Sequence, residues 1–338
     1  MTSNATPDPA FAAALESYLR GHIGGLEGPM QMERIAGGQS NPTYSVTFDN
    51  RRLVVRKQPP GKLLPSAHAV DREHKIMSAL APTGVPVPPM VLFCADPAII
   101  GTPFYIMERV EGRIFHDCTL PGQSLAERRD MYRAMAGTLA ALHTVDYAAA
   151  GLADYGKPGN YFARQVSRWS KQWELSRTRD DENVERLIKW LPANIPDDDM
   201  TSLVHGDYRL GNIMFHPTQP RVAAVLDWEL STLGHPLADV AHTAIAWLTA
   251  SDEYGGLIGV DTAALGIPSL EDFVADYNAV AGRPLTLTNF HKAFALFRWT
   301  SIFEGIAARA KAGNAAADNA SDAGQLAAIF ARRAAAFI

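Results

Sequence analysis

The stretch LVHGDYRLGNIMF, residues 203–215, followed by VAAVLDWE, residues 222–229, is the most informative part of the chain. It places Asp207, Asn212 and Asp227 around two short apolar runs that read as strands. Magnesium prefers hard oxygen ligands, commonly one or two carboxylates together with phosphate oxygens and water. Asn212 and Asp227 can supply the protein's share of these ligands, and Asp207 remains free to accept a proton from an attacking hydroxyl group.

The order of these three residues is the second clue. An Asp, an Asn five residues later and another Asp for magnesium is the arrangement that the catalytic loop of protein kinases uses. Taken singly, each residue is explained equally well as a polar cap on a turn between strands. Together, in this order and spacing, they favour an ATP- and magnesium-dependent transfer of a phosphoryl group to a hydroxyl.

HGDYRLGN and LDWE resemble the aminoglycoside phosphotransferase family, which also includes choline-kinase-like enzymes. The stretches GGQSN, VVRKQPPG and REHKIM are similar to the phosphotransferase domains found fused to acyl-CoA dehydrogenases. The resemblance extends from about Glu33 to about Ala310. It implies an α+β, protein-kinase-like bilobal fold, with a five-stranded antiparallel sheet and one helix in the first lobe and a mainly helical second lobe.

Hydrophobic patterns give the same order of elements. The expected strands of the first lobe are short, and one helix interrupts them: Met32–Ile35, Thr43–Phe48, Arg52–Arg56, helix Ala69–Leu80, Val91–Cys94 and Phe104–Met107. Long amphipathic segments follow at Leu125–Val145 and Tyr161–Leu191. We therefore expect a nucleotide-binding lobe over residues 1–110 and a catalytic and acceptor-binding lobe over residues 111–338.

The resemblance also implies residues that bind the phosphates of ATP, or of GTP. Arg56 or Lys57, at the end of the third strand, falls where the family has the cation that binds the α- and β-phosphates. The strand ending favours Arg56, and a regular strand would point Lys57 to the opposite face. Glu73 occupies the place of the helix carboxylate that orients this cation.

Further nucleotide contacts follow from the same resemblance. The turn Gly37–Asn41 would cover the phosphates, which makes Gly38, Ser40 and Asn41 candidate ligands. Main-chain groups of Glu108 and Val110 would bind the adenine. His205 and Asp239 fall where the family has residues that support the catalytic loop, so we expect structural roles for both.

Two features indicate a small hydroxylated acceptor and no protein substrate. Gly206 replaces the arginine that couples the catalytic loop of protein kinases to a phosphorylated segment. The stretch between Asp227 and Asp239 is too short to dock a peptide. The segment from Phe294 to the end has few carboxylates, which favours a neutral or anionic acceptor such as a hydroxy acid or hydroxyacyl thioester. The aromatics of residues 146–199 are either an acceptor wall or core.

Composition excludes several other classes of protein. The 338 residues are 47% hydrophobic with a formal charge of -5, which gives no basic footprint for nucleic acid. No apolar run approaches the roughly 20 residues that span a bilayer. The N-terminus lacks a signal-peptide pattern, and the two cysteines suit a reducing compartment. We therefore expect a cytoplasmic protein without membrane partners.

Two alternative functions stay open at this point. A catalytically silent nucleotide-binding protein could have the same fold, although the intact set of Asp207, Asn212 and Asp227 weighs against it. His205, Asp207, His216 and Asp227 could instead form the metal site of a hydrolase, but this hypothesis leaves the expected first lobe unexplained.

Overall fold

The structure is a computed structural model, and it describes residues 8–35, 41–61, 69–312 and 320–338. Contacts divide the chain into two units. The first unit consists of Met1–Gly112 together with Ala223–Glu229, and the second consists of Arg113–Val222 and Leu230–Ile338. The first unit is therefore discontinuous in sequence. The division of the sequence into a nucleotide-binding lobe (residues 1–110) and an acceptor-binding lobe (residues 111–338) remains a prediction.

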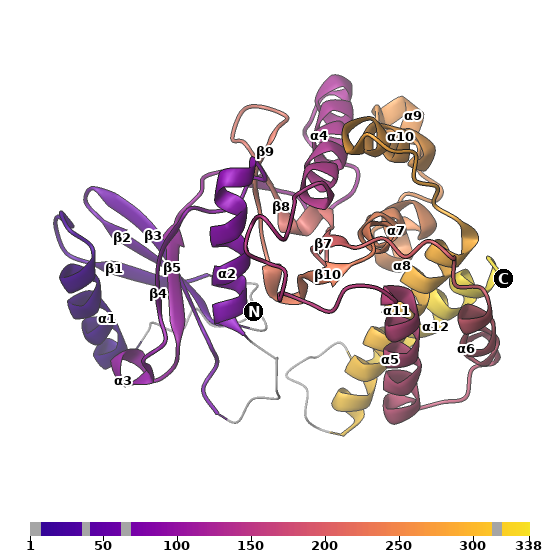
Figure 1. Cartoon of the computed structure of the whole chain (residues 1–338), viewed down its shortest axis with the longest axis horizontal. Coiled ribbons are helices and arrows are strands. Elements are labelled where there is room, and N and C mark those ends of the chain that lie inside the picture. Colours follow the sequence, from indigo (N-terminus) through magenta and orange to yellow (C-terminus); the bar gives the residue numbers. More distant parts are fainter. Residues whose placement is uncertain (1–7, 36–40, 62–68, 313–319) are drawn as a thin grey trace. The chain divides into compact units, whose positions relative to one another are not determined.

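A five-stranded antiparallel sheet with the order β1-β2-β3-β5-β4 forms the centre of the first unit, as expected (Figure 1). Its strands are β1 (Gln31–Arg34), β2 (Thr43–Phe48), β3 (Arg51–Lys57), β4 (Met90–Cys94) and β5 (Phe104–Glu108). Side chains alternate between the two faces of a strand. In β3 this places Leu53 and Val55 on one face and Val54 and Arg56 on the other.

Two helices cover the sheet, whereas the sequence indicated one. On the face of Leu53 and Val55, α1 (Pro9–His22) buries Leu15 and Leu19 in one apolar cluster with them. Asp8 caps α1 by accepting a hydrogen bond from the amide of Ala10, and Pro9 occupies its first turn, where proline costs no hydrogen bond. The short helix α3 (Pro97–Ile100) contacts α1.

On the other face lies the expected helix, α2 (Val70–Leu80), which packs against β4 and β5 and continues into the short turn η1 (Ala81–Thr83). Its apolar residues Ile76, Met77 and Leu80 are buried. Glu73 belongs to the same buried face, with 1% of its surface exposed. A carboxylate buried to this extent needs partners, and these define the first part of the site.

The second unit is mainly helical. Its helices are α4 (Leu125–His143), α5 (Tyr161–Ser176), α6 (Glu182–Ala193), α7 (Pro236–Leu248), α8 (Ser251–Tyr254), α9 (Thr262–Leu265), α10 (Leu270–Ala281), α11 (Asn289–Lys311) and α12 (Ala320–Ala335). The long helix α11 packs against α5, α7 and α12 (Figure 1). The amphipathic segment Tyr161–Leu191 consists of two helices, because Asp181 caps a new helix by accepting from the amide of Asn183.

Short strands and turns in the second unit frame the informative stretch. These are β6 (Arg113–Ile114), β7 (Ser202–Val204), η2 (Leu210–Asn212), β8 (Ile213–Phe215) and β10 (Thr232–Gly234). β7 pairs antiparallel with β10, and β6 pairs antiparallel with β8. Through β9 (Val222–Val225) the chain returns to the first unit, where η3 (Trp228–Leu230) begins after Asp227. None of the helices in the described part of the chain combines the length and apolar character needed to cross a membrane.

Candidate active site

Arg56 is the centre of a charged cluster in the first unit. Its guanidinium lies 2.9 Å from a carboxylate oxygen of Glu73 and 2.9 Å from Oδ1 of Asp227, and 3.5 Å from Glu229. Burial alone would lower the pKa of Arg56, but the nearby Glu73 carboxylate and the other acidic groups raise it above its usual value. Arg56 therefore stays charged, with a side chain only 12% exposed.

Lys57 points to the opposite face, as the alternation of the strand requires. Its Nζ donates to the main-chain oxygen of Ile100 at 3.0 Å and lies 4.6 Å from the centre of the Phe11 ring. Partial burial lowers the pKa of Lys57. Arg56, and not Lys57, thus shares a cluster with Glu73 and Asp227.

Glu73 fixes one side of Arg56. Besides Arg56, the carboxylate accepts hydrogen bonds from Nδ2 of Asn41 at 2.7 Å and from the hydroxyl of Tyr105 at 3.0 Å. Burial raises the pKa of Glu73 to about 7, while the charge of Arg56 and the Tyr105 hydroxyl act in the opposite direction. Three donors around one buried carboxylate make a rigid holder for the guanidinium.

Asp227 lies on the exposed side of the same cluster. Its φ of +64° places it in the left-handed region, which residues other than glycine rarely adopt and Asp tolerates better than most. The Asp227 side chain is 37% exposed, and Arg56 contacts its Oδ1. A strained backbone that presents a half-exposed carboxylate is typical of functional sites.

The remaining nucleotide candidates of the first unit are less defined. Gly38 and Ser40 lie outside the described residues, whereas Asn41 is fully buried and bonded to Glu73. Glu108 is the last residue of β5, and its amide donates to the main-chain oxygen of Pro89. Val110 follows the strand without regular structure.

In the second unit, Asp239 supports the loop that precedes Asp207. The buried carboxylate of Asp239 accepts hydrogen bonds from the amide of His205 at 2.6 Å and from the amide of Gly206 at 2.9 Å. His205 is itself buried, and its Nδ1 accepts from the amide of Asp207. Gly206 has a φ of +84°, and a Cβ there would lie 2.6 Å from the main-chain oxygen of Leu230, so only glycine fits.

Asp207 has a donor on each carboxylate oxygen. Its Oδ1 lies 2.8 Å from Nε2 of His242, and its Oδ2 accepts from Nδ2 of Asn212 at 2.8 Å and from Nε of Arg209 at 3.4 Å. Burial alone would raise the pKa of Asp207, but the hydrogen bond from His242 and the nearby guanidinium of Arg209 hold it well below its usual value. Asp207 is therefore an ionised carboxylate, as a general base must be.

Asn212 is oriented by the same loop. Its Nδ2 donates both to the main-chain oxygen of Asp207, at 2.9 Å, and to the Asp207 carboxylate. Because the nitrogen side of the amide is used in this way, its oxygen points elsewhere. That oxygen is the atom a magnesium ion would bind.

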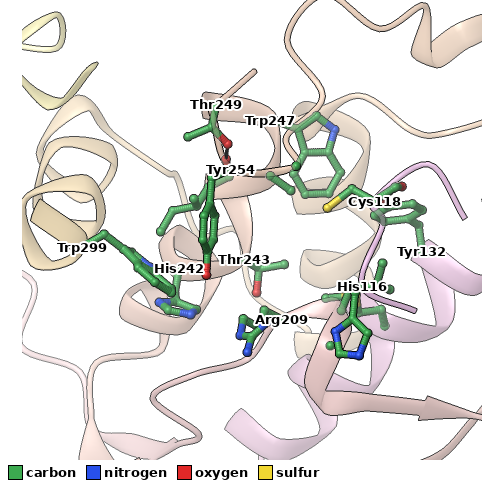
Figure 2. A pocket seen from close by; sticks show the side chains of 16 residues that line it. His116, Cys118, Tyr132, Arg209, His242, Thr243, Trp247, Thr249, Tyr254 and Trp299 are labelled. Carbon is green, nitrogen blue, oxygen red and sulfur yellow. Dashed lines mark hydrogen bonds between the residues drawn. The ribbon is translucent and has the colours of Figure 1, made fainter. Parts of the chain in front are cut away.

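A pocket of about 340 Å³ lies beside Asp207 within the second unit (Figure 2). Its sixteen described lining residues are His116, Cys118, Tyr132, Met135, Arg209, Leu210, Gly211, His242, Thr243, Ile245, Ala246, Trp247, Thr249, Tyr254, Gly255 and Trp299. Asp207 is adjacent because both His242 and Arg209 contact its carboxylate. None of the sixteen is Asp or Glu, so the pocket offers aromatic and aliphatic surface with a cationic group at Arg209.

The sequence did not reveal several of these residues. His242 lies three positions after Asp239, so a helical projection of HPLADVAH would have put both on one face, which is the available signal. The aromatics of residues 146–199 do not line the pocket. Phe162 is buried and packs edge-on against Phe290 and Phe294, so it belongs to the core.

The histidines of the hydrolase hypothesis have local structural tasks. His205 accepts from the amide of Asp207, and Nδ1 of His216 accepts from the amide of Thr218 in a turn. Among the described residues, no three His, Cys, Asp or Glu side chains are grouped as ligands of one metal ion.

Comparison with known proteins gives a family match over most of the chain. The model of the family described as "Phosphotransferase enzyme family" matches residues 31–282. The chain is 45% identical over 317 residues to mouse "Acyl-CoA dehydrogenase family member 10" and 42% identical over 308 residues to human "Acyl-CoA dehydrogenase family member 11". These matches cover 93% and 89% of this chain but 30% and 40% of the relatives, so the chain spans less than half of their length.

Solved structures confirm the expected kinase-like fold. A crystal structure from Ralstonia eutropha JMP134, titled "putative aminoglycoside phosphotransferase", is 47% identical, with a TM-score of 0.89 over 96% of this chain and 97% of that one. An aminoglycoside phosphotransferase in complex with AMP-PNP and hygromycin B shares the fold at 15% identity, with a TM-score of 0.60 over 95% of this chain and 98% of that one.

Proposed function

Because the chain belongs to the phosphotransferase enzyme family, we propose that it transfers the γ-phosphoryl group of ATP to a hydroxyl group of a small molecule. The observation that best supports this activity is the setting of Asp207. Its carboxylate is ionised, has a donor on each oxygen, and lies beside a pocket large enough for a small acceptor. A catalytically silent protein has no need for such a base.

In the proposed reaction, the acceptor oxygen forms a bond to the γ-phosphorus while the bond from that phosphorus to the β,γ-bridging oxygen breaks. The hydroxyl proton passes to Asp207, and ADP leaves. Phosphoryl transfer depends on in-line positioning and on neutralisation of charge more than on covalent help from the protein. Asp207 therefore orients the acceptor and removes its proton.

Arg56 is the proposed ligand of the α- and β-phosphates. Its planar guanidinium can bind phosphate with two parallel hydrogen bonds, and Glu73 fixes its orientation. The buried Asn41 and the main chain at Gly38 and Ser40 are proposed to complete the phosphate cover.

The adenine is proposed to bind the main chain at Glu108 and Val110. GTP could make the same contacts with the phosphate-binding groups, so the test is run with MgGTP as well as with MgATP.

Asn212 and Asp227 are proposed to hold the magnesium ion that accompanies the nucleotide. Both offer hard oxygens. Asn212 uses its Nδ2 in the contact with Asp207, and Asp227 uses its Oδ1 in the contact with Arg56. Each side chain therefore has another oxygen to offer to the metal ion. When bound, magnesium neutralises charge that develops on the phosphate oxygens. The proposal joins a residue of the second unit with one of the first, so it requires that one nucleotide contact both.

For the acceptor we propose a hydroxy acid or a hydroxyacyl thioester. A polycationic aminoglycoside needs carboxylates, and the sixteen described residues of the pocket include none. Arg209 suits an anionic group, and Tyr132, Ile245 and Trp247 suit an acyl chain. The names of the relatives, which concern acyl-CoA, support the same class.

The test is acceptor-dependent release of ADP. Purified protein with MgATP is incubated with 3-hydroxybutyrate, 3-hydroxybutyryl-CoA, choline or kanamycin. We expect the hydroxy acid or its thioester to stimulate ADP release. In Asp207→Asn, which keeps the shape but loses the charge, turnover should fall by roughly 10²–10⁴-fold, the usual range for loss of a general base. Binding of ATP should persist.

The surface change Asp130→Asn is the matched control and should leave turnover unchanged, since Asp130 is exposed on α4. Stimulation by kanamycin alone would refute the acceptor class. Binding of ATP without turnover of any acceptor would favour the silent protein, and cleavage of phosphoesters without ATP would favour a hydrolase.

A further inference from the structure

One face of α7 holds the loop around Asp207 at three points. Asp239 accepts from the amides of His205 and Gly206, and Oγ1 of Thr243 donates to the main-chain oxygen of Tyr208 at 2.7 Å. Residues three and four apart lie on one face of a helix. His242 therefore lies on the same face of α7 as Asp239 and Thr243. Its ring contacts the side chain of Asp207, the residue between the two amides that Asp239 binds and the carbonyl that Thr243 binds.

His242 is buried, and its Nε2 lies 2.8 Å from Oδ1 of Asp207. A nitrogen that faces an ionised carboxylate at this distance has to be the donor, which fixes the tautomer with the proton on Nε2. The ring of His242 also stacks on Trp299, with centroids 5.6 Å apart and planes inclined by 25°. Figure 2 shows the two rings side by side at the edge of the pocket.

The second ring nitrogen, Nδ1, is buried and has no hydrogen-bond partner among the described residues. A buried polar atom without a partner opposes folding, so an aromatic or aliphatic residue would serve the packing of α7 better. Packing therefore does not explain a histidine here. The contact that does explain it is the Nε2 hydrogen bond to Asp207.

Several ionisable groups face this pair. Arg209 and His205 act on Asp207, while Arg298 of α11 and Asp239 act on His242. Burial lowers the pKa of His242, and the Asp207 carboxylate only partly offsets this effect. His242 is accordingly a neutral donor. It orients the carboxylate without adding a full positive charge that would weaken it as a base.

We propose that His242 is a positioning residue, which fixes the plane of the Asp207 carboxylate toward the acceptor pocket by donating from Nε2 to Oδ1. Asn212 holds Oδ2 from the other side, so the two donors together prevent rotation of the carboxylate. This inference rests on the proposed phosphotransferase activity, because the role of His242 is to direct the base of that reaction.

Two variants separate the hydrogen bond from the ring. His242→Phe keeps the stacking on Trp299 but removes the donor. His242→Gln loses the ring but can place an amide N–H near the position of Nε2. We expect turnover of MgATP with the stimulating hydroxy acid or thioester to fall about 10–100-fold in His242→Phe, the range seen when a partner that orients a functional group is removed. His242→Gln should recover most of that loss.

The affinity for MgATP should be unchanged in both variants, so the loss appears in kcat. His291→Gln is the matched control, because His291 is another buried histidine whose Nδ1 contacts Thr288 at the start of α11. This control should keep full turnover. Equal turnover in His242→Phe and His242→Gln, whether high or low, would overturn the proposal, as would a lower turnover in His242→Gln than in His242→Phe.

Ring ¹⁵N NMR of histidine-labelled protein tests the same contact without any turnover, and so separates this proposal from the proposed function. We expect the His242 signals, assigned by their loss in His242→Gln, to show a neutral ring protonated at Nε2. Asp207→Asn should shift the Nε2 signal. A ring protonated at Nδ1, or an Nε2 signal indifferent to Asp207→Asn, would refute the positioning contact even if the enzyme is active.

Discussion

Replacement of Arg56 by Met should damage both nucleotide binding and stability, whereas replacement of the adjacent Lys57 by Met should affect nucleotide binding little. The two side chains leave β3 on opposite faces. Arg56 contacts Glu73 and Asp227, and Lys57 contacts the Ile100 carbonyl and the ring of Phe11. The pair is therefore a matched comparison of two cations one residue apart.

The contacts give the size of the effect on stability. Arg56 and Glu73 are 12% and 1% exposed, and breaking a buried pair from one side costs about 3–5 kcal/mol. The contact with the 37% exposed Asp227 adds about 0–1 kcal/mol. Removal of the Lys57 amine costs about 1 kcal/mol for its hydrogen bond and about as much again for its contact with Phe11.

The effect on affinity follows from the proposed role. A hydrogen bond to a charged group is worth about 1.5–3 kcal/mol, which corresponds to a loss of roughly 10–100-fold in ATP affinity for Arg56→Met. Arg56→Lys keeps the charge but not the planar pair of donors, and should fall between wild type and Arg56→Met.

Calorimetric titration with AMP-PNP and magnesium measures the affinity, and urea unfolding measures the stability. Hydrogen exchange of peptides from β3 and β5 shows whether the loss of stability is in the first unit. A larger loss of affinity in Lys57→Met than in Arg56→Met would refute the assignment of the phosphate cation. Unchanged affinity in Arg56→Met would limit Arg56 to a structural role.

Two further predictions concern the metal and the acceptor. Asp227→Ala should abolish magnesium-dependent ADP production with little change in the unfolding curve, because the side chain is 37% exposed; wild-type turnover would remove Asp227 from the metal site. Ala246→Asp puts a carboxylate into the pocket, where it should repel an anionic acceptor. A repulsion of about 1.4 kcal/mol raises KM for that acceptor about tenfold, and KM for ATP should not change. An unchanged acceptor KM in Ala246→Asp would mean that the acceptor binds elsewhere.

Much of the first unit was predictable because its strands are short apolar runs. In β3 and β5 consecutive residues are buried, which is typical of a sheet with two covered faces. The bounds of β2, Thr43–Phe48, are those expected. The helix α1 was missed since its role depends on the face of the sheet that it covers, and a local pattern does not show that face. Likewise, Asp181 begins a new helix after a break that the amphipathic pattern alone did not reveal.

The candidate site was predictable to the extent that its residues are close in sequence. Asp207 and Asn212 are five apart, so their closeness was to be expected, and the structure adds the hydrogen bond from Nδ2 of Asn212 to the Asp207 carboxylate. The contact between His242 and Asp207 spans 35 residues and depends on how α7 crosses the loop, so it required the structure. The orientation of Arg56 was predictable because alternation along a strand is a local property.

The return of the chain into the first unit has a consequence for synthesis on the ribosome. Arg56 precedes its partner Asp227 by 171 residues. At about 5–20 residues per second, the interval between the two is roughly 10–30 s. During that time the sheet can form and Arg56 can pair with Glu73. The carboxylate of Asp227, however, has not yet been synthesised. The nascent first unit thus remains incomplete until about half of the second unit has emerged.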